Sequence, residues 1–386
     1  MALPLYYNVR NLRVRWQVTL LSVIGISLVV AVFTVLMSMS EGFRLAFRET
    51  GREDNAMVFQ RGSASELTSG VPLAQRQQIM VDDRIARGSD GQPLASWEWV
   101  IVIGLPKVTD GQLTNVSMRA VTPRAFDVRG GIKLVEGRNF TPGLDEVIVG
   151  KKISERIKGL GLGGTVKYQK RDFKVVGLFS STGEAFESEI WADYDAFNAR
   201  GSGSSSLVVR MKDASQIPEL DKWIRAQPQM QLQAVQERKY YQDQAGPLAS
   251  ILKVLARAVS FIMAIGAVFG AMNTMYAIVA ARTREIGTLR ALGFSRRAIL
   301  ASFVIESVFL ALIGGAIGCL LAFPMNGFST GTGQTQSFSE IAFAFRITTQ
   351  ILTTAIGLAA LMGLIGGLLP SFRAARLPIT SALREA

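Results

Sequence analysis

The chain has 386 residues, of which 49% are hydrophobic and only 19% are charged. Because about a quarter of the residues of a soluble protein are charged, we expect part of this chain to lie in lipid. It contains no histidine and one cysteine, Cys319, which excludes histidine metal sites, histidine general bases and an intrachain disulfide.

The net charge of +12 is concentrated in three short segments beside apolar runs. Segments 1–16, 282–297 and 371–386 carry 3, 5 and 3 arginines against 0, 1 and 1 acidic residues. Short cytoplasmic loops of membrane proteins are enriched in arginine and lysine, so we predict that these segments are cytoplasmic. The pattern does not indicate a basic groove for nucleic acid.

Four apolar stretches are long enough to cross a membrane. Residues 17–40 and 258–281 are uncharged runs of 24 residues each. A helix of that length extends roughly 36 Å, against a hydrocarbon core of about 30 Å. The other two stretches lie at 298–324 and 347–370. The first run exceeds the roughly 7–15 residues of a signal peptide's apolar region and lacks its cleavage site, which favours an uncleaved anchor.

These runs predict a multi-pass α-helical membrane protein with four transmembrane helices and a large α+β extracytoplasmic domain between helices 1 and 2. Lys253 and Arg257, just before the second uncharged run, are consistent with basic side chains that snorkel to the interface. The expected order is a cytoplasmic N-terminus at 1–16, helix 1 at 17–40, the extracytoplasmic domain with its stalk at 41–250, helix 2 at 251–281, a cytoplasmic segment at 282–297, helix 3 at 298–324, an extracytoplasmic loop at 325–346, helix 4 at 347–370 and a cytoplasmic C-terminus at 371–386.

The large domain mixes predicted helices and strands. A helix is expected at 73–86, with Ile79 and Ile85 facing inward. Further expected elements are strands at 99–104, 116–121, 145–150, 188–192 and 207–211, a hairpin of 165–168 with 173–179, and helices at 151–157 and 217–226.

Two segments of this domain suggest chemistry, but neither has the required pattern. Gly159–Gly164 is glycine-rich and lacks the Gly-Lys-Ser/Thr ending of a phosphate-binding loop, so we expect a turn. An acidic cluster does not match the spacing of an EF-hand loop, so we expect a solvated loop. Its members are Glu184, Glu187, Glu189, Asp193 and Asp195. We therefore predict a non-catalytic chain with no catalytic residue, cofactor site or metal site of its own.

Glu306 is an acidic residue inside the third apolar stretch, about 12 Å along a helix from its cytoplasmic end. An ionisable group at that depth is costly and is a functional candidate. A proton relay is one interpretation, but the spans offer no second carboxylate or histidine to receive the proton. We favour a protonated or hydrogen-bonded structural contact.

Three spans carry pairs of glycines four residues apart, a spacing that lets membrane helices approach closely. The pairs are Gly266 with Gly270, Gly314 with Gly318, and Gly363 with Gly367. Glycine is common in membrane helices, so one pair alone is a weak signal. Three pairs together favour a compact bundle and a dimer.

The segment between the second and third spans reads as a short amphipathic helix. Ile286, Leu289 and Leu292 recur at every third residue and are expected to share one face. Gly293 is expected to end this helix and Ser295 to cap the next one. The residues fit a helix on anionic lipid and a helix in a groove of a cytoplasmic partner equally well.

At this segment the chain resembles the MacB/FtsX-type permeases of ATP-binding-cassette (ABC) systems. The matching sequences are RTREIGTLRALGFSRRAI at 282–299, Glu306 with the glycine run 314–318, LLPSFRAARLPITSALRE at 368–385, and AVTPRAF, LVEGRNF and FKVVGLF in the large domain.

The resemblance implies a permease that works by mechanotransmission with a separate cytoplasmic ABC ATPase, which holds ATP and magnesium. It also implies a dimer of two permease subunits in a bacterial inner membrane. The residues expected to couple to the ATPase are Arg282, Arg284, Glu285, Ile286, Gly287, Leu289, Arg290, Leu292 and Gly293.

Two classes of function remain open at this point. The permease could export a substrate or extract a lipoprotein or amphiphile, with a periplasmic adaptor and an outer-membrane channel as further partners. Alternatively, it could be a non-transporting signalling scaffold that activates a periplasmic cell-wall hydrolase. Membrane lipids are partners in both cases, and nucleic acid in neither.

Overall fold

The computed structural model describes residues 16–181, 185–197, 203–333 and 339–378. The chain divides into two compact units. The helical unit comprises Met1–Glu41, Ser250–Phe328 and Phe345–Ala386, and the sheet unit comprises Gly42–Ala249 and Ser329–Ala344.

Long apolar helices build the helical unit. They are α2 (Trp16–Arg48), α8 (Glu237–Ala281), α10 (Arg296–Ala322) and α11 (Thr349–Arg376), with the short α9 (Thr283–Ala291) between α8 and α10 and the 3-10 turn η4 (Phe323–Met325) after α10. Within the described residues, these four long helices are long and apolar enough to cross a membrane. Two of the helices are longer than the uncharged runs that predicted them. α2 continues past residue 40 to Arg48, and α8 begins at Glu237, before the run at 258–281.

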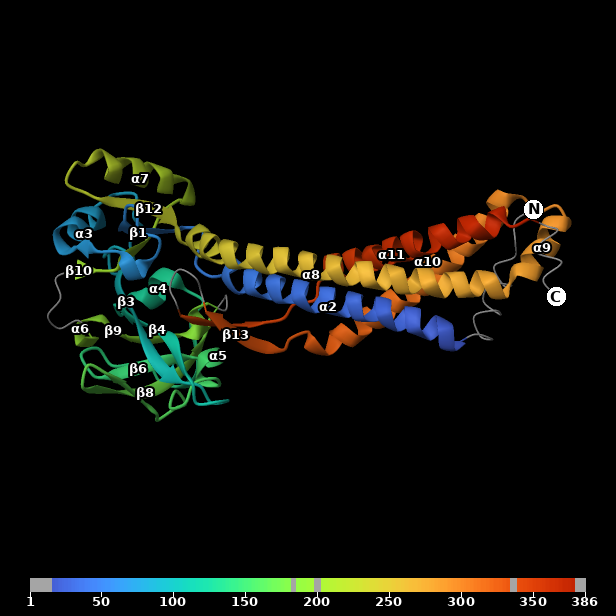
Figure 1. Ribbon diagram of the computed structural model, residues 1–386. Coiled ribbons are helices and arrows are strands. Elements are labelled where there is room, and N and C mark those ends of the chain that lie inside the picture. Colours follow the sequence, from blue (N-terminus) through green and yellow to red (C-terminus); the bar gives the residue numbers. More distant parts are fainter. Residues whose placement is uncertain (1–15, 182–184, 198–202, 334–338, 379–386) are drawn as a thin grey trace. The chain divides into compact units, whose positions relative to one another are not determined.

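Small residues and apolar side chains hold the helical unit together. α10 and α11 lie side by side (Figure 1), and Ser307 Oγ donates a hydrogen bond to Gly363 O at 2.7 Å. The buried core shared with α2 consists of Ile26, Val29, Val30, Phe33, Ala311, Ala355, Ala359 and Met362. Close packing of small side chains is the expected source of stability where lipid removes the hydrophobic driving force.

The sheet unit contains a mixed sheet whose ten described strands follow the order β12-β1-β11-β3-β4-β9-β6-β8-β5, with β7 beside β8. Neighbours pair antiparallel except β4 with β9 and β6 with β8, which are parallel. The strands are β1 (Asn55–Gln60), β3 (Ala95–Pro106), β4 (Leu113–Val121), β5 (Lys133–Gly137), β6 (Glu146–Gly150), β7 (Thr165–Tyr168), β8 (Arg171–Ser180), β9 (Glu189–Asp193), β11 (Ser206–Arg210) and β12 (Leu232–Gln236).

Two apolar cores lie on this sheet. α7 (Ile217–Ala226) packs along β12 and covers one core with Ile217, Leu220 and Ile224 (Figure 1). The other core is centred on β6, β8 and β9 and includes Ile153 of α5 (Lys151–Ser154). The remaining short elements are η1 (Glu66–Thr68), β2 (Val71–Pro72), α3 (Leu73–Met80), α4 (Ala125–Arg129), η2 (Phe186–Ser188), α6 (Tyr194–Phe197), β10 (Gly203–Ser204) and η3 (Ala214–Gln216).

Most predicted elements of this domain are confirmed, including the 165–168 hairpin strand, the turn at 159–164 and the helix at 217–226. Two helix predictions were too long. The helix from Leu73 ends at Met80, because the Asp82 carboxylate accepts a hydrogen bond from Arg84 N and stabilises a turn instead. Ile79 and Ile85 are both buried, as predicted. The helix at 151–157 ends at Ser154.

The segment between the third and fourth spans, predicted as a loop, contains the strands β13 (Ser329–Gly333) and β14 (Glu340–Ala344), which pair antiparallel within the sheet unit. Glu340 is 3% exposed and accepts hydrogen bonds from Arg156 Nη2 at 2.6 Å and Thr114 Oγ1 at 2.7 Å. Burial would raise the pKa of the Glu340 carboxyl, but these two donors outweigh burial and lower it. The partners are 184 and 226 residues away in the sequence, so no local pattern reveals them.

Candidate coupling site

α9 is a nine-residue helix with defined ends on both sides. After it, Gly293 has a φ of +94°, a backbone conformation that favours glycine. The hydroxyl of Ser295 then accepts a hydrogen bond from Ala298 N at 3.2 Å and caps α10. The predictions that Gly293 ends the short helix and Ser295 caps the next one are confirmed.

Glu306 is paired with the residue that precedes α9. Arg282 Nη1 lies 2.9 Å from Glu306 Oε2, and both side chains are buried, at 7% and 3% exposure. The guanidinium of Arg282 also lies 3.2 Å from Glu285 and 5.2 Å from the ring centroid of Phe303. Glu306 therefore makes a hydrogen-bonded structural contact. Its partner, Arg282, is one of the residues predicted to couple to the ATPase.

An apolar contact fixes α9 beside this ion pair. Ile286 is 2% exposed and belongs to a cluster that draws on α8, α10 and α11. The other buried members of the cluster are Met275, Ile278, Val279, Ile299, Phe303 and Ala374. Through Arg282 and Ile286, α9 is thus attached to three of the long helices.

The outward side of α9 differs from the expected apolar face. Ile286 points inward, Leu289 is half-buried and Leu292 is 72% exposed. The three do not share a face because the helix ends at Ala291, so Leu292 lies in the turn that follows. The remaining predicted coupling residues divide in the same way, with Gly287 buried, Arg290 half-buried, and Arg284, Glu285 and Gly293 exposed.

The three glycine pairs have different surroundings. A Cβ on Gly318 would lie 2.5 Å from Ser27 O, and one on Gly314 would lie 3.0 Å from Val23 O, so this pair contacts α2. Gly363 and Gly367 contact Ala311 and Ser307 of α10. Gly266 and Gly270 of α8 have no described atom within 4 Å of an added Cβ. Two pairs therefore pack inside the helical unit and the third faces outward.

A buried ion network at the centre of the sheet unit was not anticipated. The guanidinium of Arg119 contacts Glu66, Glu98 and Glu189 at 2.7–2.8 Å. Burial opposes its charge, but Glu189 and Glu66 outweigh burial and raise the pKa of Arg119. Arg129 pairs with Glu98 at 2.8 Å, which extends the network.

The network also holds the first turn of α8. Glu237, the first residue of α8, lies 3.2 Å from Arg129 Nε and accepts a hydrogen bond from Asn55 at 2.8 Å. Tyr241, one turn later, contacts Arg119 at 3.4 Å. Burial raises the pKa of the Tyr241 hydroxyl, so it remains a neutral hydrogen-bonding group at neutral pH. The network thus joins the start of α8 to the middle of the sheet.

The prediction of a solvated acidic loop was wrong for two of its members. Glu189 is buried against Arg119, and the buried Asp193 accepts hydrogen bonds from Gly143 N and Ala196 N, both at 2.9 Å. Asp195 is exposed, as expected, and Glu187 is half-buried. Glu184 lies outside the described residues. Among the described residues, no group of three or more histidine, cysteine, aspartate or glutamate side chains is placed so that it could hold a metal ion.

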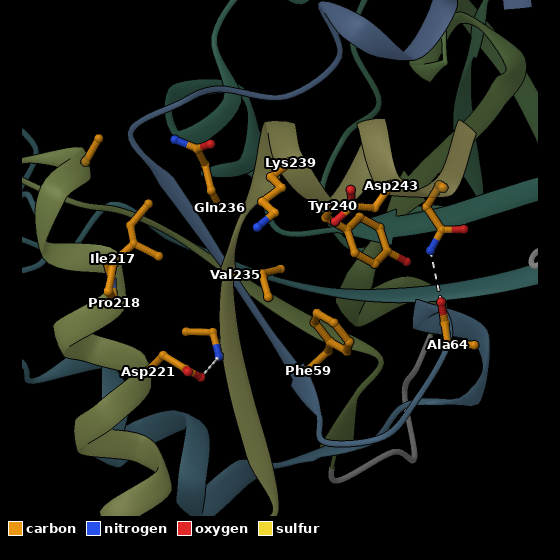
Figure 2. Close-up of a pocket in the computed structure, with 13 residues that line it drawn as sticks. Phe59, Ala64, Ile217, Pro218, Asp221, Val235, Gln236, Lys239, Tyr240 and Asp243 are labelled. Carbon is orange, nitrogen blue, oxygen red and sulfur yellow. Dashed lines mark hydrogen bonds between the residues drawn. The ribbon is translucent and has the colours of Figure 1, made fainter. Parts of the chain in front are cut away.

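A cavity of about 590 Å³ lies where β12 forms the edge of the sheet. Figure 2 shows Asp221 of α7 beside this strand, and its carboxylate accepts a hydrogen bond from Ala234 N at 2.9 Å. On the other side, the rings of Phe59 and Tyr240 lie 5.4 Å apart. Asp221 thus accepts a hydrogen bond from a backbone N–H on the outer edge of β12. This contact protects the edge of the sheet against pairing with another chain.

A membrane permease subunit is the class of protein that combines these features. They are the long apolar helices, the sheet unit and the short basic helix between two candidate spans. Family models support this class. A model described as the MacB-like periplasmic core domain matches residues 19–227, and one described as the FtsX-like permease C-terminal matches residues 257–379. The first match covers more than half of the chain. The chain therefore belongs to the MacB/FtsX family of ABC transporter permeases and is an inner-membrane protein.

Individual relatives are distant. The chain is 25% identical to the pyoverdine export ATP-binding/permease protein PvdT of Pseudomonas fluorescens (strain Pf0-1), across 95% of this chain and 57% of the relative. It is 25% identical to the uncharacterized ABC transporter permease YvrN of Bacillus subtilis (strain 168), across 98% of both. It is 25% identical to the macrolide export ATP-binding/permease protein MacB of Neisseria gonorrhoeae (strain ATCC 700825 / FA 1090), across 70% of this chain and 44% of the relative.

Among solved structures, the periplasmic region of MacB from Actinobacillus actinomycetemcomitans matches with a TM-score of 0.37 and 15% identity. That match covers 52% of this chain and 96% of the other. The chain spans only 57% of the length of the PvdT relative.

Proposed function

We propose that this chain couples ATP hydrolysis by a separate cytoplasmic ABC ATPase to movement of the periplasmic sheet unit. The observation that carries this proposal is the division of α9 into a side attached to the long helices and an exposed side. α9 belongs to the arginine-rich segment 282–297, which supports a cytoplasmic location under the positive-inside rule. Both chain termini are proposed to lie on that same side.

The attached side of α9 would pass a displacement to the membrane helices. Arg282 reaches Glu306 of α10, and Ile286 packs among residues of α8, α10 and α11. Packed side chains and a buried ion pair resist separation, because separating them exposes apolar surface and leaves buried charges unpaired. A movement of α9 is therefore expected to move the ends of these helices with it.

The exposed side of α9 would contact the ATPase. Leu292 is exposed in the turn after the helix, and Arg284, Glu285 and Thr288 are exposed along the helix before it. An exposed leucine together with exposed charged and polar groups on the same short segment has the composition of a small protein-binding surface. ATP and magnesium would be held by the partner.

The direction of transport and the oligomeric state of the permease are part of the same proposal. The names of the PvdT and MacB relatives describe export, and we propose export or extraction of an amphiphile here as well. We also propose a dimer of permease subunits, with the outward pair Gly266 and Gly270 of α8 as the contact between copies.

Co-purification with the ATPase tests the coupling proposal. Leu292→Asp should remove most of the ATPase that co-purifies with the full chain, because a charge replaces the exposed apolar contact. Leu134→Asp, a matched change at an exposed leucine of the sheet unit, should leave the co-purified amount unchanged. Equal ATPase recovery with Leu292→Asp and wild type would contradict the proposal.

A further inference from the structure

A second cavity, of about 300 Å³, lies within the helical unit at the ends of the long helices that adjoin the sheet unit in sequence. α2 contributes Phe33, Met37 and Glu41, α8 contributes Lys253 and Arg257, and α11 contributes Gln350, Ile351 and Thr354 together with its cap residue Thr348. The volume is at the lower end of the range for ligand pockets. With the sheet unit on the periplasmic side, as the proposed function has it, this cavity lies at the periplasmic end of the bundle.

Two basic side chains of α8 lie on one face of the helix and line the cavity. Lys253 and Arg257 are four residues apart, so their side chains are neighbours on the helix surface. In the part of the chain that the structure describes, neither of them forms an ion pair with a carboxylate within 4.0 Å. Glu41 is the carboxylate of the lining, which leaves a formal charge of +1.

The rest of the lining is amphipathic. Phe33 and Ile351 are buried apolar residues on the cavity wall, and Gln350 offers an amide group. Phe261, one turn beyond Arg257 on the same face of α8, is 68% exposed. The cavity therefore combines cations at the headgroup level with apolar surface that continues toward the hydrocarbon.

We propose that this cavity binds one anionic glycerophospholipid of the outer leaflet, held by its phosphate. Lys253 and Arg257 would contact the phosphate, and an acyl chain would lie over Phe261. A headgroup with a single negative charge, such as phosphatidylglycerol, matches the charge of the lining. Basic side chains at a membrane surface favour anionic lipid by about fivefold per cation, which is the gain expected here for each of the two.

Native mass spectrometry of the full chain in detergent tests this proposal, with phosphatidylglycerol and diacylglycerol of the same acyl chains as probes. The wild type should retain one phosphatidylglycerol per chain, with at least about tenfold preference over diacylglycerol, which lacks the phosphate. The double variant Lys253→Gln/Arg257→Gln should bind phosphatidylglycerol at least about tenfold more weakly. Equal retention of the two lipids by the wild type would overturn the proposal.

Two further variants separate this site from general attraction of lipid to basic helix ends. Arg296→Gln/Arg297→Gln removes two exposed cations at the start of α10, away from the cavity lining, and should change retention by less than about twofold. Thr354→Trp should fill the cavity and weaken retention about as much as the double variant. Among the described residues, the Thr354 hydroxyl donates to Gln350 O of its own helix and to no other group, so little stability is lost.

Three outcomes would each overturn the inference. They are an equal loss of lipid with the α10 control, full retention with Thr354→Trp, and displacement of the lipid by millimolar inorganic phosphate. The last result would identify a site for free phosphate. Because the assay contains no ATPase, it is independent of the proposed coupling function.

Discussion

The helical unit and the sheet unit both bury charged side chains, but they do so on different scales. In the helical unit, Arg282 pairs with Glu306 beside an apolar cluster. In the sheet unit, Arg119 contacts three carboxylates, and the network extends through Arg129 to Glu237. The small pair joins α9 to α10, whereas the larger network joins the start of α8 to a sheet.

The difference follows from the surroundings. Lipid cannot solvate a charge, so a membrane helix carries few ionisable groups and each needs a partner nearby. A sheet with many strands brings distant residues together and can satisfy several carboxylates around one guanidinium. We infer that each arrangement holds one end of α8, which runs from Glu237 to Ala281. The network contacts Glu237 at its start, and the Arg282–Glu306 pair lies directly after its last residue.

The largest expected effect comes from removing the guanidinium of Arg119. Arg119→Met would leave Glu66, Glu98 and Glu189 buried without this partner, and breaking a buried ion pair costs about 3–5 kcal/mol. We expect the full chain to lose protease resistance in the sheet unit, as measured by limited proteolysis in detergent. Arg124→Met, at an arginine nearer the surface, is the control and should leave the resistance unchanged. Normal resistance of Arg119→Met would show that the network does not stabilise the unit.

The second-largest effect is expected from breaking the pair of Arg282 and Glu306 in the helical unit. Glu306→Ala should lower thermal stability in detergent and reduce ATPase coupling, because Arg282 is left buried and unpaired, at a cost of about 3 kcal/mol. The double variant Arg282→Met/Glu306→Leu should restore both, since apolar side chains can replace a buried pair. If the double variant is stable but transport stays abolished, Glu306 has a role in proton transfer and the structural interpretation is wrong.

Acidification should affect the sheet unit through Glu340. Its pKa is lowered in the folded protein, so its ion pair contributes stability above the unfolded pKa of about 4.3, and this contribution is lost as the pH falls through the folded pKa. We expect the protection of β14 amides, measured relative to their intrinsic exchange rate at each pH, to decrease below about pH 4. In Glu340→Gln, this protection should be lower at pH 7 and should respond less to acid than in wild type. An identical pH response in the two proteins would exclude Glu340 as the cause.

The smallest effect is expected at the junction of α9 and α10. Ser295→Ala removes the hydroxyl that accepts from Ala298 N and should cost about 1 kcal/mol, measured as a decrease of a few degrees in melting temperature. Ser295→Asp keeps a capping oxygen and should retain most of the stability. A decrease with Ser295→Asp as large as that with Ser295→Ala would mean that the cap is not the source of the effect.

Local signals in the sequence were enough to place many elements. Gly293 and Ser295 act on their own neighbours, so the ends of α9 and α10 could be predicted. α7 was predicted with its observed bounds, because its apolar residues follow the helical period over ten positions.

The charged contacts could not be predicted, because they join distant residues. Arg282 and Glu306 are 24 residues apart, Arg119 and Glu189 are 70 apart, and Arg156 and Glu340 are 184 apart. Nothing in the local pattern indicates which charged residues will be buried together. For the same reason, the segment 325–346 was predicted as a loop, although β14 owes its position in the sheet unit to a buried Glu340.

Site-specific photo-cross-linking from position 292 tests the central claim most directly. With a photoreactive residue in place of Leu292, illumination of membranes that contain the full transporter should link the permease to its ABC ATPase. The same residue in place of Leu134 in the sheet unit should give no such product. Cross-links from position 292 to lipid alone, with none to an ATPase, would mean that α9 lies on the membrane surface and would contradict the account.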